Sequence, residues 1–366
     1  MSSTEVTSTG RPDEATPVGT APRSPLLARE GAVAGQGLDA AVTWHHGDPV
    51  REQRLLLAGE AVTDTSHREV VTVSGADRLT WLDTLSTQWL RDLAPGAGAE
   101  ALVLSPHGHV ENALHLVDDG STTWITVEPG AGTALVTHLE RMRFLLRVEI
   151  TDVTADWAVV SGVPGAAVDA LGTEHLRWID PWPAVTTGGV SYSAVAVDEH
   201  PGAERSWVEV LVPRERLPVL TADLALAGTW ASEALRVAAW RPRFGVDTDH
   251  RTIPHELDWL RTAVHLQKGC YRGQETVARV HNLGRPPRRA VFVHLDGSGH
   301  QLPGAGTPLT APGGRDGDRP VGRLTSVARH HELGPIALAV VKRSVPLDAV
   351  LLADGVSAAQ EAVVSP

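Results

Sequence analysis

The feature that most constrains the fold is a change in the hydrophobic pattern near residue 289. Before this position, strand-type runs are interspersed with runs whose apolar residues recur every three or four positions, as in a helix. After it, only short strand-type runs remain, separated by loops rich in Gly and Pro such as PGGRDGDRP. Mixed elements without a regular βαβ alternation predict an α+β fold. The final part predicts a small β-barrel, joined through the proline-bearing stretch NLGRPPRR.

The same patterns assign the individual segments. Strands are expected at residues 67–75, 100–104, 121–128, 147–153, 156–162, 190–197 and 206–212, and in the last part at 289–295, 321–328, 336–342 and 350–354. Helices are expected at residues 76–93, 133–146, 216–228 and 230–240.

Composition excludes several classes of protein. The 44 acidic and 32 basic residues give a formal net charge of −12, so bulk electrostatics would not draw the chain to a nucleic acid. One cysteine cannot form an intramolecular disulfide or a zinc site of paired cysteines, which fits a reducing cytoplasm. No run reaches about 18 apolar residues, so no contact with a membrane is expected.

The chain divides into three expected regions. Residues 1–40 are rich in Ser, Thr, Pro and Gly at their start, have no signal-peptide pattern, and are expected to form a disordered tail. Residues 41–285 form the α+β region. Residues 286–366 form the β-barrel.

The single cysteine lies in the stretch KGCYRGQE, residues 268–275. The thiolate is the nucleophilic form of cysteine, and nearby cations favour it. In an extended segment Lys268 and Arg272 would lie on the same side as Cys270, two residues to either side of it. Gly269 and Gly273 leave the backbone open to a ligand. We therefore expect Cys270 to be a reactive thiol and Lys268 to assist it.

The rest of the stretch is equally polar. Gln274 and Glu275 could bond the amide and amine edges of a heterocycle, with Tyr271 as a further member of the motif. The alternative is that Cys270 is a small buried apolar residue, the commonest role of a lone cysteine. A segment this polar is poorly suited to a dry core, which favours a reachable thiol.

These residues resemble a known family. KGCYRGQE is similar to the K-G-C-Y-x-G-Q-E signature of the YgfZ family, folate-binding proteins that maintain iron–sulfur enzymes and are related to the T-protein of the glycine cleavage system. Further similarities follow in the family's order. They are DTSH at residues 64–67, VSGAD at 73–77, LSPHG at 104–108, FGVD at 244–247 and GRLTS at 322–326.

The resemblance implies a GcvT-like arrangement of three units around a central opening that holds tetrahydrofolate. Two of these units would be intertwined subdomains within residues 41–285, dividing near residue 150. The implied function is support of the assembly or repair of iron–sulfur proteins, with indirect effects on tRNA modification. The implied partners are folate and either iron–sulfur proteins or their assembly machinery.

The alternative is a folate-dependent aminomethyltransferase or demethylase of the T-protein type, and whether the chain catalyses any turnover is left open. Those enzymes resemble one another in an aspartate pair after L-S-P/T-P-x-G. Here Asn112 and Ala113 stand in that register, and Glu111 falls one position early. Their G-E-x-G segment also has no match in ERSWVEVLVP, where a folate-facing glutamate is expected. Both departures argue against methylamine transfer, which needs a positioned base.

Four positions are candidates for folate contact. Arg236, in a helix that resembles one bordering the folate site, could bind a carboxylate through its planar guanidinium or could be a surface charge. Trp230 and Trp240 flank this helix and could stack on a pterin, although packing in the core is the commoner role. Asn112 is the fourth, because of its register.

A basic cluster follows the signature. Its members are Arg279, His281, Arg285, Arg288 and Arg289. It could be an interdomain linker, a contact for RNA, or a clamp for the polyglutamate tail of folates, for which Arg288 and Arg289 are the candidates. The paired histidines lack the spacing of a metal site, and one cysteine is too few to hold an iron–sulfur cluster, so no bound metal is expected.

Overall fold

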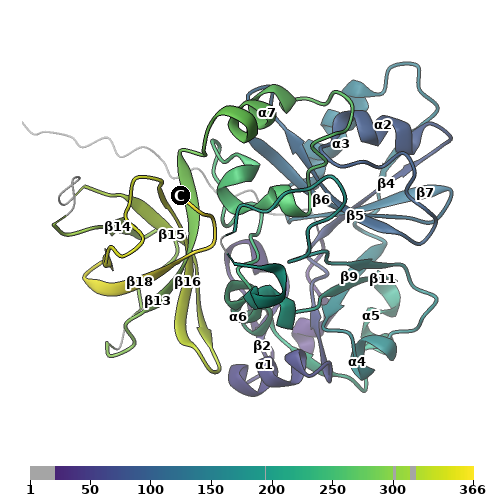
Figure 1. The fold of residues 1–366 in the computed structure, drawn as a ribbon. Helices are drawn as coiled ribbons and strands as arrows, with labels where there is room; N and C mark the ends of the chain where they lie inside the picture. Colours follow the sequence, from purple (N-terminus) through teal and green to yellow (C-terminus); the bar gives the residue numbers. More distant parts are fainter. Residues whose placement is uncertain (1–20, 194, 300–301, 314–318) are drawn as a thin grey trace, which may run out of the picture.

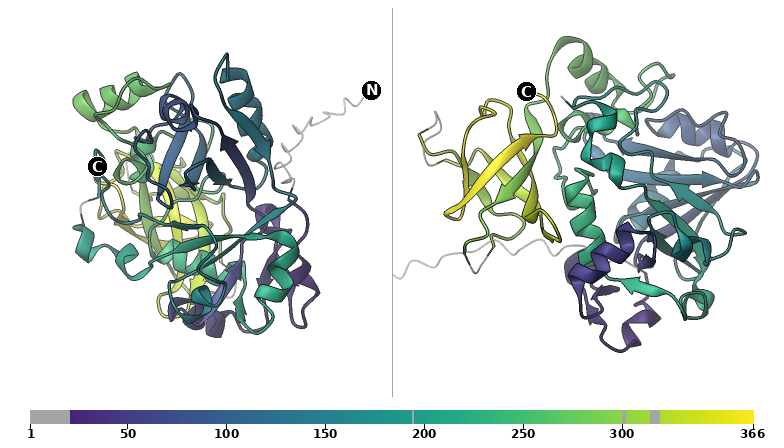
Figure 2. Two further views of the ribbon diagram at one scale, coloured as in Figure 1. Left: turned by 90° about the vertical axis from the view of Figure 1, so that its right-hand side faces the viewer. Right: turned by 60° about the horizontal axis from the view of Figure 1, so that its bottom comes forward.

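The computed structural model describes residues 21–366, except residues 194, 300–301 and 314–318. The chain forms two five-stranded sheets, a set of helices and a closed six-stranded barrel (Figure 1). The two sheets and their helices form one body, and the barrel stands beside it (Figure 2). The predicted α+β fold with a terminal β-barrel is confirmed.

Order begins earlier than the expected tail boundary. Residues 1–20 lie outside the described part of the chain, but residues 21–40 already contain the short 3₁₀ helices η1 (Pro25–Ala28) and η2 (Gly37–Asp39) and strand β1 (Val33–Ala34). Leu26 is buried against the second sheet, and Asp39 is buried as well. For residues 21–40 the prediction of a disordered tail is therefore wrong, because these side chains find partners that lie far away in the sequence.

The first sheet has the strand order β5-β6-β7-β4-β8 and is antiparallel throughout. Its strands are β4 (Glu69–Ser74), β5 (Gly98–Leu104), β6 (Val110–Asp118), β7 (Thr122–Val127) and β8 (Glu149–Asp152). Helices α2 (Arg78–Leu85) and α3 (Gly132–Met142) bury apolar side chains such as Leu82 and Leu135 against Val71 and Ile125 of this sheet. One face of the sheet is thus closed by helices.

The second sheet has the order β10-β11-β9-β3-β12, in which only the β3–β12 pair is parallel. Its strands are β3 (Ala61–Asp64), β9 (Trp157–Gly162), β10 (Arg177–Ile179), β11 (Val208–Pro213) and β12 (Ala225–Ala227). The chain enters this sheet at β3, builds the whole first sheet, and returns at β9. The two sheets are therefore interleaved along the sequence.

The remaining elements that precede the barrel are one short strand and a set of helices. They are β2 (Thr43–His45), α1 (Pro49–Leu57), α4 (Ala166–Asp169), η3 (Val197–Glu199), η4 (Pro201–Glu204), η5 (Arg214–Arg216), α5 (Leu217–Leu220), α6 (Thr229–Ala238), η6 (Pro254–Leu257), η7 (Trp259–Arg261) and α7 (Gln274–Leu283). None of the helices in the described ranges is long and apolar enough to cross a bilayer.

The barrel closes in the order β13-β16-β15-β14-β17-β18. Its strands are β13 (Arg288–Leu295), β14 (Pro308–Thr310), β15 (Gly322–His330), β16 (Gly334–Lys342), β17 (Leu351–Ala353) and β18 (Val356–Ala362). Helix α6 lies between the barrel and the second sheet (Figure 1). Phe292 and Leu338 pack into the same apolar cluster as Trp240 and Leu257, so the barrel is joined to the body by a shared core.

Several local predictions are wrong, each for a tertiary reason. Helix α2 ends at Leu85, well before residue 93, because the carbonyls beyond it bond a distant lysine. Residues 190–197 form no strand among their described positions, since Val190 and Tyr192 donate to Leu260 and Asp258 instead. Most of 216–228 is not helical, and residues 225–227 form β12, which pairs in parallel with β3. Strands β1, β2, β3, β6, β10, β12, β14 and β18 were not expected.

Candidate functional site

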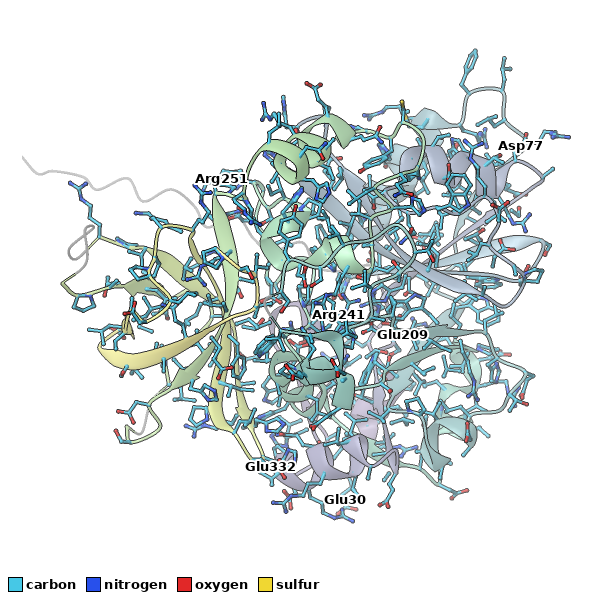
Figure 3. The ribbon with its side chains drawn as sticks, viewed as in Figure 1. Glu30, Asp77, Glu209, Arg241, Arg251 and Glu332 are labelled. Atoms are coloured by element: carbon cyan, nitrogen blue, oxygen red, sulfur yellow. The ribbon has the colours of Figure 1, made fainter. Side chains whose placement is uncertain are left out.

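A polar pocket lies where the inner faces of the two sheets meet α6 and the segment that follows it. Glu209, on β11, and Arg241, just after α6, lie close together at the centre of the molecule in Figure 3. The cavity volume is about 90 Å³, small beside the roughly 300–1,000 Å³ of ordinary ligand pockets. In this conformation the pocket could enclose the head of a ligand and not a whole folate.

One wall is held by a chain of ion pairs around Arg243. Its guanidinium bonds Asp39 at 2.8 Å and Glu128 at 2.9 Å, and Arg68 bonds the same Glu128 at 2.6 Å. His67, of the DTSH motif, contacts Asp39 at 2.9 Å. Burial alone would raise the pKa of Asp39, but Arg243 and His67 outweigh this effect and hold the pKa far below its usual value. The buried charges on this wall are therefore paired, as buried charges must be.

A second ion-pair group lies around Arg241. This arginine bonds Glu100 of β5 at 2.8 Å and Asp180 at 3.1 Å. Trp259 also donates to Glu100, at 3.0 Å. The first sheet is thereby tied to the chain that follows β10 and α6.

Glu209 is the carboxylate that projects into the pocket from the second sheet. It accepts hydrogen bonds from His115 of β6 at 2.9 Å and from Thr126 of β7 at 2.9 Å. The His115 ring stacks on Trp178 of β10, with the centroids 3.7 Å apart and the planes 5° from parallel. Burial tends to raise the pKa of Glu209, but Arg68 and His115 outweigh it and lower the pKa to about 2.

Five buried polar atoms that belong to pocket-lining residues have no hydrogen-bond partner within the described structure. They are Glu100 Oε2, His67 Nδ1, Arg68 Nε, Arg205 Nε and Arg241 Nη1. A buried polar atom without a hydrogen-bond partner lowers the stability of the fold, so such atoms at a pocket indicate a ligand or ordered water. One carboxylate acceptor, three guanidinium donors and one imidazole nitrogen match the mixed amide and amine edge of a pteridine. The residues present therefore fit a folate head group.

The signature residues occupy a different place. Cys270 is free and exposed, as the sequence predicts, but it is not among the residues that line the pocket. Gln274 and Glu275 form the first turn of α7 and do not line the pocket either. The structure therefore does not bring the thiol and the expected folate site together.

Lys268 does not flank the thiol. Its ammonium group is buried and donates to the backbone carbonyls of Asp83, Ser86 and Gln88, the last two at 2.8 and 2.7 Å. The ammonium also lies 3.4 Å from the Asp83 carboxylate. The assignment of Lys268 as an assistant to the thiol is corrected by this geometry, which makes it an anchor between the signature and the end of α2.

The other signature residues also support the loop. Arg272 pairs at the surface with Glu111, at 3.0 Å. Tyr271 is buried in the core that joins the body to the barrel. Gly273 has a φ of +83°, and a Cβ there would lie 2.6 Å from the Ser105 carbonyl oxygen. The structure thus explains why glycine stands at this position.

The expected folate contacts are only partly placed at the pocket. Arg236 lines it, but its guanidinium is occupied by Glu233, Asp247 and Ser326, so it ties α6 to the barrel. Trp230 lies outside the pocket and packs on Trp44, with the ring centroids 5.5 Å apart.

Two further candidates lie outside the pocket as well. Trp240 lines a second cavity, between α6 and the barrel, together with Phe292. Asn112 is buried, and its neighbour Ala113 is the residue that lines the pocket. These positions do not support direct contact with a ligand in the central pocket.

The two arginines proposed to clamp polyglutamate are engaged elsewhere. Arg288 bonds Asp249 at 2.6 Å and Glu256 at 2.7 Å. Arg289 is fully buried and donates to the carbonyl of Val345 at 3.1 Å. Arg289 is not available at the surface, and both residues secure the first strand of the barrel.

Sequence reasoning missed His115, Trp178 and Glu209. The missing G-E-x-G pattern indicated that this stretch lacks the expected glutamate, but Glu209, from the same stretch, lines the pocket. A signal was present, since a charge in the middle of the apolar run VEVLV indicates a buried and paired carboxylate. Strand β6 was not predicted, so the sequence analysis did not indicate toward which face of a sheet His115 would point.

Three comparisons with known proteins bear on this geometry. No family model matches the chain. It is 28% identical over 295 residues to the tRNA-modifying protein YgfZ of Edwardsiella ictaluri, a match covering 77% of this chain and 84% of that protein. It is 25% identical over 288 residues to a putative chloroplastic transferase of Arabidopsis thaliana, covering 73% of this chain and 62% of that protein.

A third relative is the mitochondrial iron–sulfur cluster assembly factor IBA57 homolog of Mycosarcoma maydis, 26% identical over 240 residues, with 62% of this chain and 55% of that protein covered. The match thus covers less than two thirds of the chloroplastic and mitochondrial relatives. The fold matches the glycine cleavage aminomethyltransferase T of Bartonella henselae, with a TM-score of 0.71 at 18% identity over 93% of this chain and 95% of that one. The chain is therefore similar in sequence to the YgfZ and IBA57 relatives, and its two interleaved sheets and closed barrel share the fold of the aminomethyltransferase.

Proposed function

We propose that this chain binds a tetrahydrofolate through its central pocket and supports the assembly or repair of iron–sulfur proteins, with Cys270 as its reactive thiol. The observation that carries the proposal is the exposure of the chain's single thiol on a loop that buried contacts hold in place. The names of the YgfZ and iron–sulfur assembly relatives support the pathway.

The pocket supports the folate part of the proposal. Its unpartnered atoms, Glu100 Oε2 and Arg241 Nη1 among them, offer a carboxylate acceptor and guanidinium donors to a heterocycle. The rest of a folate would extend beyond the cavity, since its volume is about 90 Å³. Bound folate supplies one-carbon chemistry, while the residues of this chain orient its head group and limit the access of water.

The loop supports the thiol part. Lys268 fixes the chain before Cys270, and Tyr271 fixes it after, so the cysteine is presented from a rigid support. An exposed thiol can reach a cysteine, a sulfur species or a damaged cluster on another protein, because it does not have to leave a core. The pocket and the thiol then serve separate steps: one binds the cofactor and the other meets the partner.

The alternative, a folate-dependent aminomethyltransferase, is favoured by the fold match. It predicts that a methylamine donor is converted to methylene-tetrahydrofolate. Neither Asn112 nor Ala113 provides a carboxylate at the expected place, and of the two only Ala113 lines the pocket. Product formation by the purified chain would favour this alternative over the assembly role.

The test compares two variants of the full-length chain. Cys270→Ala is expected to keep its folding and its affinity for tetrahydrofolate, measured calorimetrically under anaerobic conditions, and to lose rescue of a cluster-dependent enzyme in a strain lacking the chain. Gly269→Ala is the matched control, because a Cβ there meets nothing within 4 Å. Full rescue by Cys270→Ala would refute the role of the thiol. Failure of the parent chain to bind tetrahydrofolate would refute the cofactor.

A further inference from the structure

His115 lies in the middle of β6, on the strand face that looks into the pocket. Its cross-strand neighbours are Glu100 on β5 and Thr126 on β7. Its Nδ1 lies 2.9 Å from Glu209 Oε1 of the facing sheet. Among the described residues, no hydrogen bond to its other ring nitrogen, Nε2, is found. One nitrogen of the imidazole is therefore engaged, and the other is left for a ligand.

The surrounding charges decide which nitrogen carries the proton. Because the pKa of Glu209 is lowered to about 2, this carboxylate is ionised at neutral pH and can only accept. In the neutral ring, Nδ1 then donates to this carboxylate, which leaves a lone pair on Nε2. Arg68 Nη2 also approaches Nδ1, at 3.3 Å, but cannot donate to a nitrogen that carries hydrogen. The shorter bond of Arg68, at 2.6 Å, runs from its other terminal nitrogen, Nη1, to Glu128.

The ring is held in a fixed orientation. Stacking on Trp178 at 3.7 Å fixes its plane, and the indole is itself held by a bond from its Nε1 to the Ala99 carbonyl at 3.0 Å. An aromatic face and an adjacent carboxylate both stabilise an imidazolium. The positive charge of Arg68, which would destabilise an imidazolium, is paired with Glu128. Glu100, on the neighbouring strand, adds a further carboxylate that stabilises it.

We propose that His115 and Glu209 form a proton-transfer pair for a heterocyclic amine bound in the central pocket. Nε2 accepts a proton from a ligand nitrogen: the ligand N–H bond breaks, its electron pair stays on the ligand, and a new N–H bond forms on the imidazole. Glu209 keeps its charge and stabilises the resulting imidazolium. The proton returns along the same path, so no oxidant or further reactant is needed.

The ligand class rests on the proposed function, because a reduced pterin is such an amine. Ala113 occupies the pocket wall where a carboxylate base was expected, and His115 lies two residues further on the same strand face. The pocket therefore keeps a proton acceptor although the expected aspartate is missing. The pair is a base supplied from a neighbouring position, with Glu209 as the positioning residue.

The first measurement needs no ligand. The full chain is labelled with ¹⁵N-histidine, and long-range ¹H–¹⁵N spectra assign His115 among the 17 histidines by the signal lost in His115→Gln. The exposed His107→Gln is the control, and it removes a different signal. The neutral ring of His115 is expected to carry its hydrogen on Nδ1. Glu209→Gln, which preserves shape, is expected to lower the ratio of Nδ1–H to Nε2–H by about fivefold, because a neutral acceptor is weaker. A predominant Nε2–H form in the parent chain would overturn the proposal.

The second measurement adds tetrahydrofolate. Binding is expected to shift the Nε2 signal of His115, and calorimetry in phosphate and in Tris is expected to show net proton exchange that His115→Gln abolishes. Binding without any change at Nε2 and without proton exchange would overturn the pair as a proton acceptor. If tetrahydrofolate does not bind, the cofactor proposal fails separately. Carbethoxylation of the free protein by diethyl pyrocarbonate then decides whether Nε2 is an accessible base: labelled His115 supports the pair, and unlabelled His115 refutes it.

Discussion

Replacing Lys268 by Met tests whether the lysine beside Cys270 is an anchor or a chemical group. The substitution keeps a long side chain but removes the ammonium, which donates to three backbone carbonyls and lies 3.4 Å from Asp83. The carbonyls of Asp83, Ser86 and Gln88 and the Asp83 carboxylate would then lose a buried cation. The anchor role predicts a large loss of stability.

The magnitude follows from these contacts. Removing one partner of a buried, hydrogen-bonded charge typically costs about 3–5 kcal/mol. With a urea dependence of roughly 3 kcal/mol per molar for a chain of this size, the unfolding midpoint should fall by about 1–1.7 M. Arg272→Met is the matched control on the other side of Cys270. Its partner Glu111 is exposed, so the loss should stay below about 1 kcal/mol.

The assay is urea unfolding followed by tryptophan fluorescence, together with the rescue assay for Cys270. A Lys268→Met chain with an unchanged midpoint but no rescue would show that the ammonium acts chemically, and would refute the anchor role. Equal losses in the Lys268 and Arg272 variants would also refute it, because burial is the only basis for the difference.

Three further predictions follow from the same contacts. Gly273→Ala should lower the free energy of unfolding by about 2–3 kcal/mol in urea titrations, because Gly273 has a φ of +83° and a Cβ there would crowd the Ser105 carbonyl. The control Gly269→Ala should change it by no more than about 0.5 kcal/mol. Equal effects of the two substitutions would contradict this prediction. Glu209 has a folded pKa of about 2 against 4.5 unfolded, so its stabilisation is present above pH 4.5 and lost as the pH falls toward 2. The stability difference between the parent chain and Glu209→Gln, roughly 3 kcal/mol at neutral pH, should therefore shrink over that window in acid titrations, and a constant difference would argue against the assignment. Arg288→Met should lower the stability of the barrel junction by about 2–4 kcal/mol, because Asp249 and Glu256 lose their partner. The difference in affinity between monoglutamyl and pentaglutamyl folates, measured by calorimetry, should not change. Loss of this difference with an intact fold would support Arg288 as a polyglutamate-binding residue.

The fold class was predictable because hydrophobic periodicity is a local property. The apolar runs of β9, β13 and β16 fix these strands whatever they pack against, and the amphipathic pattern of α3 does the same for a helix. Residues 190–197 show where such reasoning fails. Their β-branched and aromatic content predicts a strand, but a buried aspartate, Asp258, binds the backbone at Tyr192 instead.

The site was predictable only in part. An exposed Cys270 followed from the polarity of its neighbours, which no dry core could accommodate. The direction of Lys268 did not follow, because sequence spacing says nothing about carbonyls some 180 residues away. The positions of Arg288 and Arg289 beside the signature suggested a clamp, but their partners lie within the barrel junction.

The sequence by itself determined the order of elements, the strand-only character of the last part and the accessibility of the thiol, since each depends on residues that are neighbours in the chain. The tertiary structure alone decided that His115, Trp178 and Glu209 meet, because they come from β6, β10 and β11 of two interleaved sheets. A buried carboxylate has to find its partners across such distances, and only the folded chain brings them within hydrogen-bonding reach.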